Sequence, residues 1–280
     1  MRASPWLAGL AVLLLGAGCS TGGGTGGSSA GTLSARDRVP ADLRQAGVLV
    51  VGSDETYAPM EFLKDGQAVG FDVDLAGALA GKLGLRLDYR AADFGTLIDQ
   101  VTTGKITMAM SSMTDNAKRQ KLVEFVDYLN VGSSIVIHKD AADVIGYRGL
   151  CGLRVGGQPD TFYVDVLNDT ASACPAGRKL TPVLTKDPVG AMRAGKIDAY
   201  VNDYPLAAYD VNSDSSLRIS GEQIEAAPYG MAVAKQRHDI AKAIQAALYE
   251  LIDDGTYDKV VAKWKLPDGS LKTGALNGGA

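Results

Sequence analysis

Short apolar, β-branched runs alternate with segments of helical periodicity from Val48 onward, and this alternation constrains the fold more than any other feature of the chain. The run 48–51 has the length and composition of a buried strand. In 72–83 leucines recur every four residues, with Asp72 placed to cap a helix and Gly84 placed to end it. Such alternation is typical of domains in which helices cover a largely parallel sheet. We therefore expect an α/β fold.

The same alternation continues in two series, which predicts two lobes. The first series predicts helices over 95–103 and 117–124 and strands over 107–110 and 134–137. The second predicts strands over 153–155 and 199–201, helices over 161–167 and 187–194, then a strand over 231–234 and helices over 238–252 and 256–264. With 280 residues, 46% of them hydrophobic, the chain is long enough for two such units.

The first residues have the layout of a secretory signal peptide. Arg2 precedes an apolar stretch over 6–15, and small residues lead to Cys19. The stretch is too short to span a bilayer, so we expect 1–18 to be removed. Residues 20–34 are mostly glycine, serine, threonine and alanine, which predicts a flexible tether over 19–40.

The segment Gly16-Ala17-Gly18-Cys19 resembles the lipobox of bacterial lipoproteins. That resemblance implies that the sulfur of Cys19 carries a diacylglycerol with palmitate-type chains and that the protein is exported and held at the outer face of the cell membrane. Gly16 departs from the motif, which usually has a larger aliphatic residue there. Release as a plain secreted protein is the alternative.

The remaining cysteines, Cys151 and Cys174, form an even pair in an exported chain, which predicts a disulfide. His138 and His238 lie far apart without clustered cysteines or carboxylates, so we expect no metal site, and no cofactor motif stands out. The 28 basic and 32 acidic side chains give a net charge of −4, which argues against nucleic acid as a partner.

Several segments together resemble the polar and cationic amino-acid-binding proteins of ABC importers, a family of bacterial extracellular solute-binding proteins (family 3). They are GSDETYAPMEF at 52–62, GFDVDL at 70–75, SSMT at 111–114 with Arg119, GKIDA at 195–199 with Asp203, and DGTY at 254–257. They occur in the family's order from Val48 to Trp264.

The resemblance implies a two-lobed periplasmic-binding-protein fold, the Venus flytrap of type II, with two hinge strands. Lobe 1 would be discontinuous, formed by 41–137 and 231–266, and lobe 2 would span 138–230. The crossings would lie near Ile137 and Gly230, and 267–280 would be a tail.

The resemblance also assigns a ligand site between the lobes. Arg119 would grip the ligand carboxylate, for which a planar guanidinium is suited because it donates two parallel hydrogen bonds. The Thr114 hydroxyl would contact the ligand backbone, and the Ser112 carbonyl would accept from the ligand ammonium. Asp203 would pair with the ammonium from lobe 2, and Thr161 would add a contact to the carboxylate.

Tyr57 and Phe94 match positions that sandwich the ligand and exclude water. Asp160 stands where the family commonly has glycine, and it either caps the following helix or adds negative charge to the cleft. Asp54 matches an acid that faces the ligand side chain in relatives with cationic ligands. The resemblance therefore favours arginine or lysine, with histidine, ornithine and glutamine left open.

These features predict a monomeric binding protein, not an enzyme, that closes around one free L-amino acid and delivers it to a membrane permease with its ATPase. Relatives with this fold include a cyclohexadienyl dehydratase, so a dehydratase acting on prephenate or arogenate is one alternative. An amino-acid sensor that reports to a membrane signalling partner is the other.

Overall fold

The computed structural model describes residues 33–266 and 274–280. The expected signal peptide, the lipidated Cys19 and most of the tether lie outside the described residues. Within the described part, no helix is long and apolar enough to cross a bilayer.

The main sheet of the described residues has eight strands in the order β5-β1-β6-β11-β7-β10-β8-β9. β1 pairs in parallel with β5 and β6, and β8 pairs in parallel with β9 and β10, whereas β7 and β11 are antiparallel. The strands are β1 (Val48–Ser53), β5 (Arg86–Ala91), β6 (Met108–Ala109), β7 (Val123–His138), β8 (Arg154–Gly157), β9 (Thr181–Leu184), β10 (Ala199–Asp203) and β11 (Leu217–Ala234). A small second sheet holds β2 (Thr56–Tyr57), β3 (Glu61–Lys64) and β4 (Gln67–Val69).

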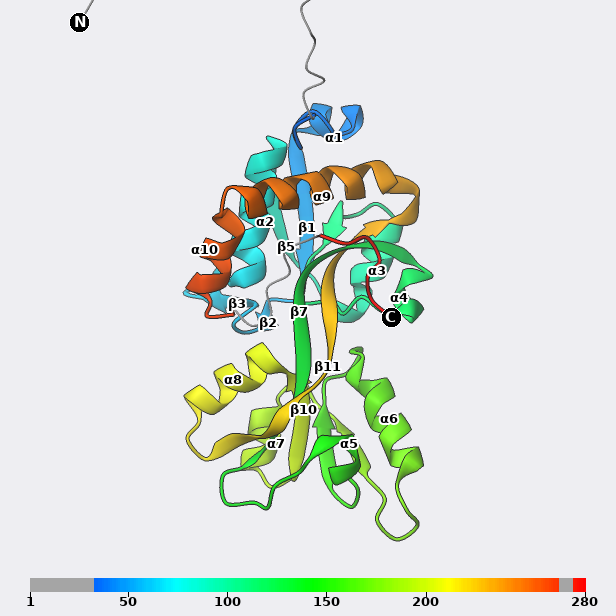
Figure 1. Ribbon diagram of the computed structural model, residues 1–280, viewed down its shortest axis with the longest axis vertical. Coiled ribbons are helices and arrows are strands. Elements are labelled where there is room, and N and C mark those ends of the chain that lie inside the picture. Colours follow the sequence, from blue (N-terminus) through cyan, green and yellow to red (C-terminus); the bar gives the residue numbers. More distant parts are fainter. Residues whose placement is uncertain (1–32, 267–273) are drawn as a thin grey trace, which may run out of the picture. The chain divides into compact units, whose positions relative to one another are not determined.

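Helices lie around both ends of the sheet (Figure 1). Near β1 and β5 they are α1 (Ala41–Ala46), α2 (Phe71–Leu83), α3 (Leu97–Thr102), α4 (Ala117–Gln120), α9 (His238–Asp253) and α10 (Thr256–Lys263). Near β8 and β10 they are α5 (Gly146–Gly149), α6 (Tyr163–Ala173), α7 (Pro188–Arg193) and α8 (Tyr204–Ser213). Short 3₁₀ turns cover Phe94–Thr96 and Lys235–Arg237.

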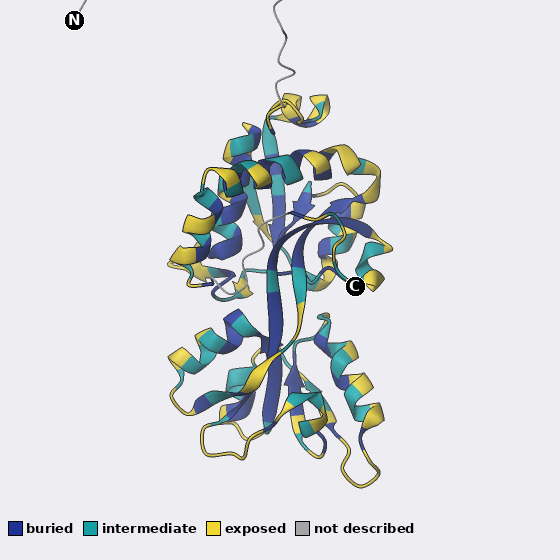
Figure 2. Cartoon of the chain, viewed as in Figure 1, coloured by how far each residue is buried: buried dark blue, intermediate teal, exposed yellow. Residues whose placement is uncertain are grey.

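The long strand β7 enters all four hydrophobic clusters of the described chain. Successive side chains of a strand point to opposite faces, so Phe125 joins the cluster with α3 while Val126 joins the cluster with α2 and α9. Further along, Ile135 and Val136 enter the two clusters formed by α6 and by α7 and α8. β7 is therefore buried along nearly all of its length, whereas the middle of β11 is exposed (Figure 2).

Most expected elements are confirmed, often with longer bounds. α9 covers the helix predicted over 238–252 and buries an apolar face that includes Ile240, Ile244 and Leu248, and α2 ends at Gly84, which has a φ of 68°. The strand predicted over 134–137 is the end of the 16-residue β7, and the one predicted over 231–234 is the end of the 18-residue β11. Residues 210–230, which show no clear pattern in the sequence, complete α8 and begin β11.

Three local predictions are wrong. Asp72 does not cap α2, because its buried carboxylate accepts hydrogen bonds from the Ser112 N–H (2.8 Å) and the Tyr128 hydroxyl (2.9 Å). The helix predicted over 117–124 ends at Gln120, since β7 begins at 123. The helix predicted from 161 begins at 163, without a side-chain cap from Asp160.

The predicted disulfide is present. Cys151 and Cys174 are joined with 5.6 Å between their Cα atoms. Both are buried in the cluster that also holds α6, so the bond ties the end of α6 to the residues before β8.

Candidate functional site

One pocket collects all the residues predicted to contact a ligand. It encloses roughly 590 Å³ of empty space, including solvent at its mouth. Its walls come from the β1–β2 turn, the loop after β6, α4, the β8–α6 loop and the end of β10. The predicted residues on these walls are Asp54, Tyr57, Phe94, Ser112, Thr114, Arg119, Thr161 and Asp203. Whether they hold a ligand remains a prediction.

Arg119 is a half-buried cation. Its Nη1 donates to the Thr114 carbonyl at 2.9 Å, and its guanidinium carbon lies 5.3 Å from the centre of the Phe94 ring. Burial lowers the pKa of Arg119 from 12.5 to about 10. No acidic side chain of the described residues forms an ion pair with it within 4 Å, although Asp203 lines the same pocket.

The loop after β6 is held by a buried acid pair. The Ser111 hydroxyl donates to Glu61 at 2.8 Å, and the Ser112 hydroxyl donates to the same carboxyl group at 3.2 Å. Burial, together with the neighbouring charge of Asp72, raises the pKa of Glu61 well above its usual value, and burial raises the pKa of Asp72 to about 7. The pair fixes Ser112, whose φ is 49°, through hydrogen bonds to its hydroxyl and its backbone N–H.

Tyrosine hydroxyls surround the carboxylate of Asp203. Tyr163 donates to Asp203 Oδ1 at 2.7 Å, and the Tyr57 hydroxyl lies 2.8 Å from Asp203 Oδ2 and 2.7 Å from Asn202 Oδ1. Burial raises the pKa of Asp203 above its usual value, opposed by the hydroxyls of Tyr229, Tyr163 and Tyr57. Since Tyr57 is on β2 and Asp203 on β10, these contacts join the two ends of the molecule across the pocket.

The two aromatic residues predicted to sandwich a ligand have different surroundings. Phe94 lies against the guanidinium of Arg119, and its backbone N–H donates to Asp54 at 3.2 Å. Tyr57 lines the pocket, and its hydroxyl contacts the carboxylate of Asp203.

Three further acidic residues, Asp54, Asp93 and Asp160, line the pocket. Asp54 accepts from the Thr56 hydroxyl at 2.6 Å, and Asp93 forms an ion pair with Lys186 at 3.3 Å. Asp160 is exposed, with a left-handed φ of 63°, the conformation that favours glycine. Its side chain approaches Gly95, where an added Cβ would lie 3.1 Å from Asp160 Oδ2. The expectation that Asp160 caps α6 is thus wrong, and its charge lies on the pocket wall.

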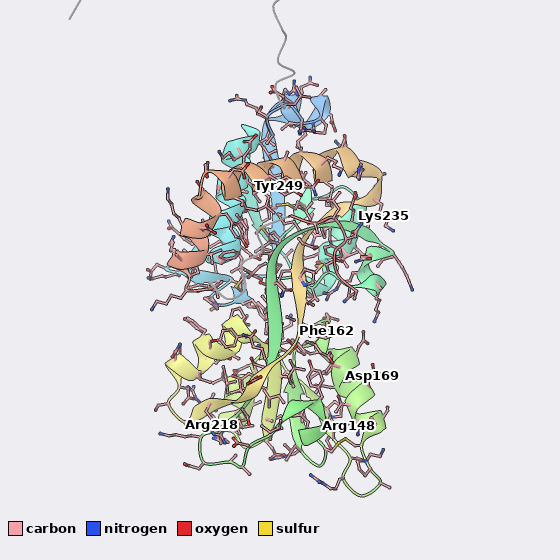
Figure 3. The ribbon with its side chains drawn as sticks, viewed as in Figure 1. Arg148, Phe162, Asp169, Arg218, Lys235 and Tyr249 are labelled. Carbon is pink, nitrogen blue, oxygen red and sulfur yellow. A yellow bond between two sulfur atoms is a disulfide. The ribbon has the colours of Figure 1, made fainter. Side chains whose placement is uncertain are left out.

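The β8–α6 loop completes the wall. The Thr161 hydroxyl donates to the Gln158 carbonyl at 2.8 Å and accepts from the Tyr163 N–H at 3.3 Å. Phe162, labelled in Figure 3, lies where this loop enters α6, at the end of the helix nearest the pocket. No group of three or more metal-binding side chains occurs among the residues that the structure describes.

Sequence reasoning missed the partners of the predicted residues. Tyr163 follows Phe162 at a helix start, where a pair of aromatic residues looks like ordinary packing. Asn202 and Lys186 stand in segments without a motif, so nothing in the sequence marks them. Glu61 and Asp72 lie within the recognised motifs, but their contact depends on a sheet and a helix meeting in three dimensions.

Comparison with known proteins places this geometry in context. The model of the bacterial extracellular solute-binding proteins, family 3, matches residues 49–267. The arginine-binding protein ArgT of Corynebacterium glutamicum is 31% identical over 247 residues, which are 85% of this chain and 81% of that protein.

Solved structures of the same kind are similar over most of the chain. An ancestral arginine-binding protein bound to arginine is 34% identical with a TM-score of 0.72, covering 78% of this chain and 98% of that one. The ancestral amino acid-binding protein AncCDT-1, a precursor of cyclohexadienyl dehydratase, is 29% identical with a TM-score of 0.72, covering 80% and 97%. The expected two-lobed α/β fold of type II is therefore confirmed. The chain belongs to the bacterial extracellular solute-binding proteins of family 3.

Proposed function

We propose that this chain binds one free L-amino acid in the pocket and closes around it. The observation that carries the proposal is Arg119, a half-buried guanidinium on the pocket wall that lacks an acidic partner within 4 Å among the described residues. A buried charge without a counter-charge is costly. A ligand carboxylate would supply the missing anion through two parallel, charge-assisted hydrogen bonds.

The other end of an amino acid has a matching group. Asp203 is a buried carboxylate held by hydroxyls, which an ammonium group can join or replace. A cation and an anion on facing walls of one pocket complement the two charges of a zwitterion. Ser112, Thr114 and Thr161 would add polar contacts, and Tyr57 and Phe94 would exclude water.

For the ligand side chain we propose a cation, with arginine or lysine preferred. Asp54, Asp93 and Asp160 line the pocket, and among the described residues Lys186 forms an ion pair with Asp93 alone. The arginine-binding names of the similar proteins support the same class.

Delivery to an importer follows from this activity. We propose that the closed form is recognised by a membrane permease driven by its ATPase, and that acyl chains on Cys19 hold the chain near that permease. Cys19→Ser should move the protein from the membrane fraction to the medium. If the variant stays in the membrane fraction, the anchor is wrong.

A dehydratase activity is the second candidate, because a precursor of such an enzyme is among the similar structures. Incubation with prephenate or arogenate should give no aromatic product. Turnover of either compound would overturn the assignment as a binding protein.

The main test is calorimetric titration of ligand-stripped protein that begins after Cys19, using the twenty amino acids and ornithine. L-arginine should then be compared with agmatine, which lacks the carboxylate, and with N-acetyl-arginine, which lacks the ammonium. We expect each analogue to bind at least about 100-fold more weakly, because each loses a charge-assisted pair. Equal binding of arginine and agmatine would remove Arg119 from its proposed role, and no binding of any amino acid would refute the function.

A further inference from the structure

The segment 274–280 pairs with the edge of β7. The Asp127 N–H donates to the Ala275 carbonyl at 2.9 Å, and Phe125 and Asn277 exchange two hydrogen bonds, one of 2.9 Å through the Asn277 side chain and one of 3.1 Å between backbones. β10 pairs with β7 only over 133–137, so the segment covers the part of β7 nearest α4 (Figure 1). Tyr249 on α9, labelled in Figure 3, places its hydroxyl 3.3 Å from the Gly274 carbonyl.

From β7 the segment continues to the residues that carry Arg119. The Gly278 N–H donates to Asp127 at 3.0 Å, and the Gly279 N–H donates to Asp115 at 2.9 Å. The side-chain amide of Gln120 donates both to the Gly279 carbonyl at 2.9 Å and to Asp115 at 2.8 Å. Asp115 and Asp127 are each 1% exposed, so these donors reach buried carboxylates, although Asp127 Oδ1 has no hydrogen-bond partner among the described residues.

The opposite side of the same residues is held by β11. The Asp115 N–H donates to the Pro228 carbonyl at 2.9 Å, and the Gly230 N–H donates to the Met113 carbonyl at 2.9 Å. The stretch 113–120, which carries Thr114 and Arg119, therefore lies between β11 and the segment 274–280.

We propose that the segment 274–280 is a positioning element for Arg119, setting the orientation in which its guanidinium meets the ligand carboxylate. The inference rests on the proposed function. α4 has four residues and little stability of its own, so its place depends on contacts at both sides. Because a guanidinium gives two parallel hydrogen bonds only in the correct plane, a small displacement of α4 weakens the grip.

Gly279 provides a point change that displaces the segment without touching the pocket. A Cβ there would lie 2.1 Å from the Asp115 carbonyl oxygen, so Gly279→Ala cannot keep this contact. Gly77→Ala is the matched control, because nothing lies within 4 Å of its Cβ position on α2. A variant lacking 275–280 removes the contacts altogether.

The experiment compares the Kd for L-arginine with the Kd for L-argininamide, which lacks the carboxylate. We expect the wild type and Gly77→Ala to prefer the acid strongly, and Gly279→Ala and the deletion to reduce that preference at least about 10-fold. A general loss of stability would weaken both probes alike. An unchanged preference in both variants, or equal weakening of both probes, would overturn the inference.

Hydrogen exchange gives a readout that needs no ligand. The backbone N–H of Gln120, which donates to the Asn116 carbonyl at 2.9 Å, should exchange its hydrogen faster in Gly279→Ala than in Gly77→Ala. If the wild type binds neither probe, the proposed function has failed for this ligand, and faster exchange still supports the positioning contact. Unchanged exchange in Gly279→Ala and in the deletion refutes it.

Discussion

Replacing Arg119 by methionine should separate ligand affinity from stability. Burial lowers the pKa of Arg119 from 12.5 to about 10, which corresponds to roughly 3 kcal/mol at about 1.4 kcal/mol per pKa unit. Because the folded pKa is the lower one, this cost is fully present at pH 7 and fades only as the pH rises through the range from about 10 to 12.5.

Methionine keeps an unbranched apolar stem in place of the arginine stem and removes the charge. The substitution also loses the hydrogen bond to Thr114 and the contact with Phe94, about 1 kcal/mol each. The two effects nearly offset each other, so the free energy of unfolding of the empty protein should stay unchanged or rise by about 1 kcal/mol.

Ligand binding should respond in the opposite way. Two charge-assisted hydrogen bonds to a carboxylate contribute roughly 3 kcal/mol or more, so Kd should rise at least about 100-fold. Calorimetry and thermal melting of the ligand-free protein measure the two quantities. Lys121 is an exposed charge next to α4, so Lys121→Met is the control. It should change neither the Kd nor the melting temperature of the ligand-free protein. Wild-type affinity in Arg119→Met would refute the reasoning, as would a clear loss of stability without ligand.

Further predictions concern charge, the disulfide and the pocket wall. Burial raises the pKa of Asp127 to about 7, so the wild type loses stability as pH rises from about 4 to 7. Asp127→Asn should therefore gain stability over the wild type across that window, by up to roughly 4 kcal/mol in urea melts, and a constant difference would contradict this. Replacing Cys151 and Cys174 by serine should cost roughly 3 kcal/mol for a loop of this length, measured by thermal melting, and an unchanged Tm would contradict it. Asp160→Gly should raise the stability of the empty protein by about 1 kcal/mol by relieving the left-handed backbone, and should weaken arginine binding more than glutamine binding in calorimetry. Equal effects on the two ligands would remove Asp160 from cation selection.

Local signals predicted the elements whose determinants lie within a few residues. The stripe of α9 and the glycine after α2 were sufficient to place those helices. Asp72 was misread because its carboxylate bonds to Ser112 and Tyr128, partners that no local pattern reveals. β11 was only partly predicted, since its middle is exposed and contains residues that weaken a strand pattern, including Pro228.

In the candidate site, too, the residues within motifs could be predicted and their distant partners could not. Its charged residues stand in recognisable motifs, so the resemblance could assign Arg119 and Asp203 to one pocket. The groups that set their properties come from distant segments. Tyr57 reaches Asp203 across 146 positions and Tyr163 across 40, and these separations carry no sequence signal. The backbone of Asp160 could be predicted in part. The family commonly has glycine at this position, and glycine favours the left-handed conformation that Asp160 adopts.

The hydroxyls around Asp203 already hold its carboxylate before any ligand enters. In the ligand-free protein its two oxygens already accept hydrogen bonds from the hydroxyls of Tyr57 and Tyr163. A carboxylate can accept about four hydrogen bonds, so an incoming ammonium can join these hydroxyls or replace one of them. Where it replaces one, hydrogen-bond donors are exchanged and the net enthalpy gained at Asp203 is small. The same exchange penalises any compound that pushes a tyrosine aside without offering a donor in return. Discrimination at this position thus comes from the bonds that a wrong ligand breaks.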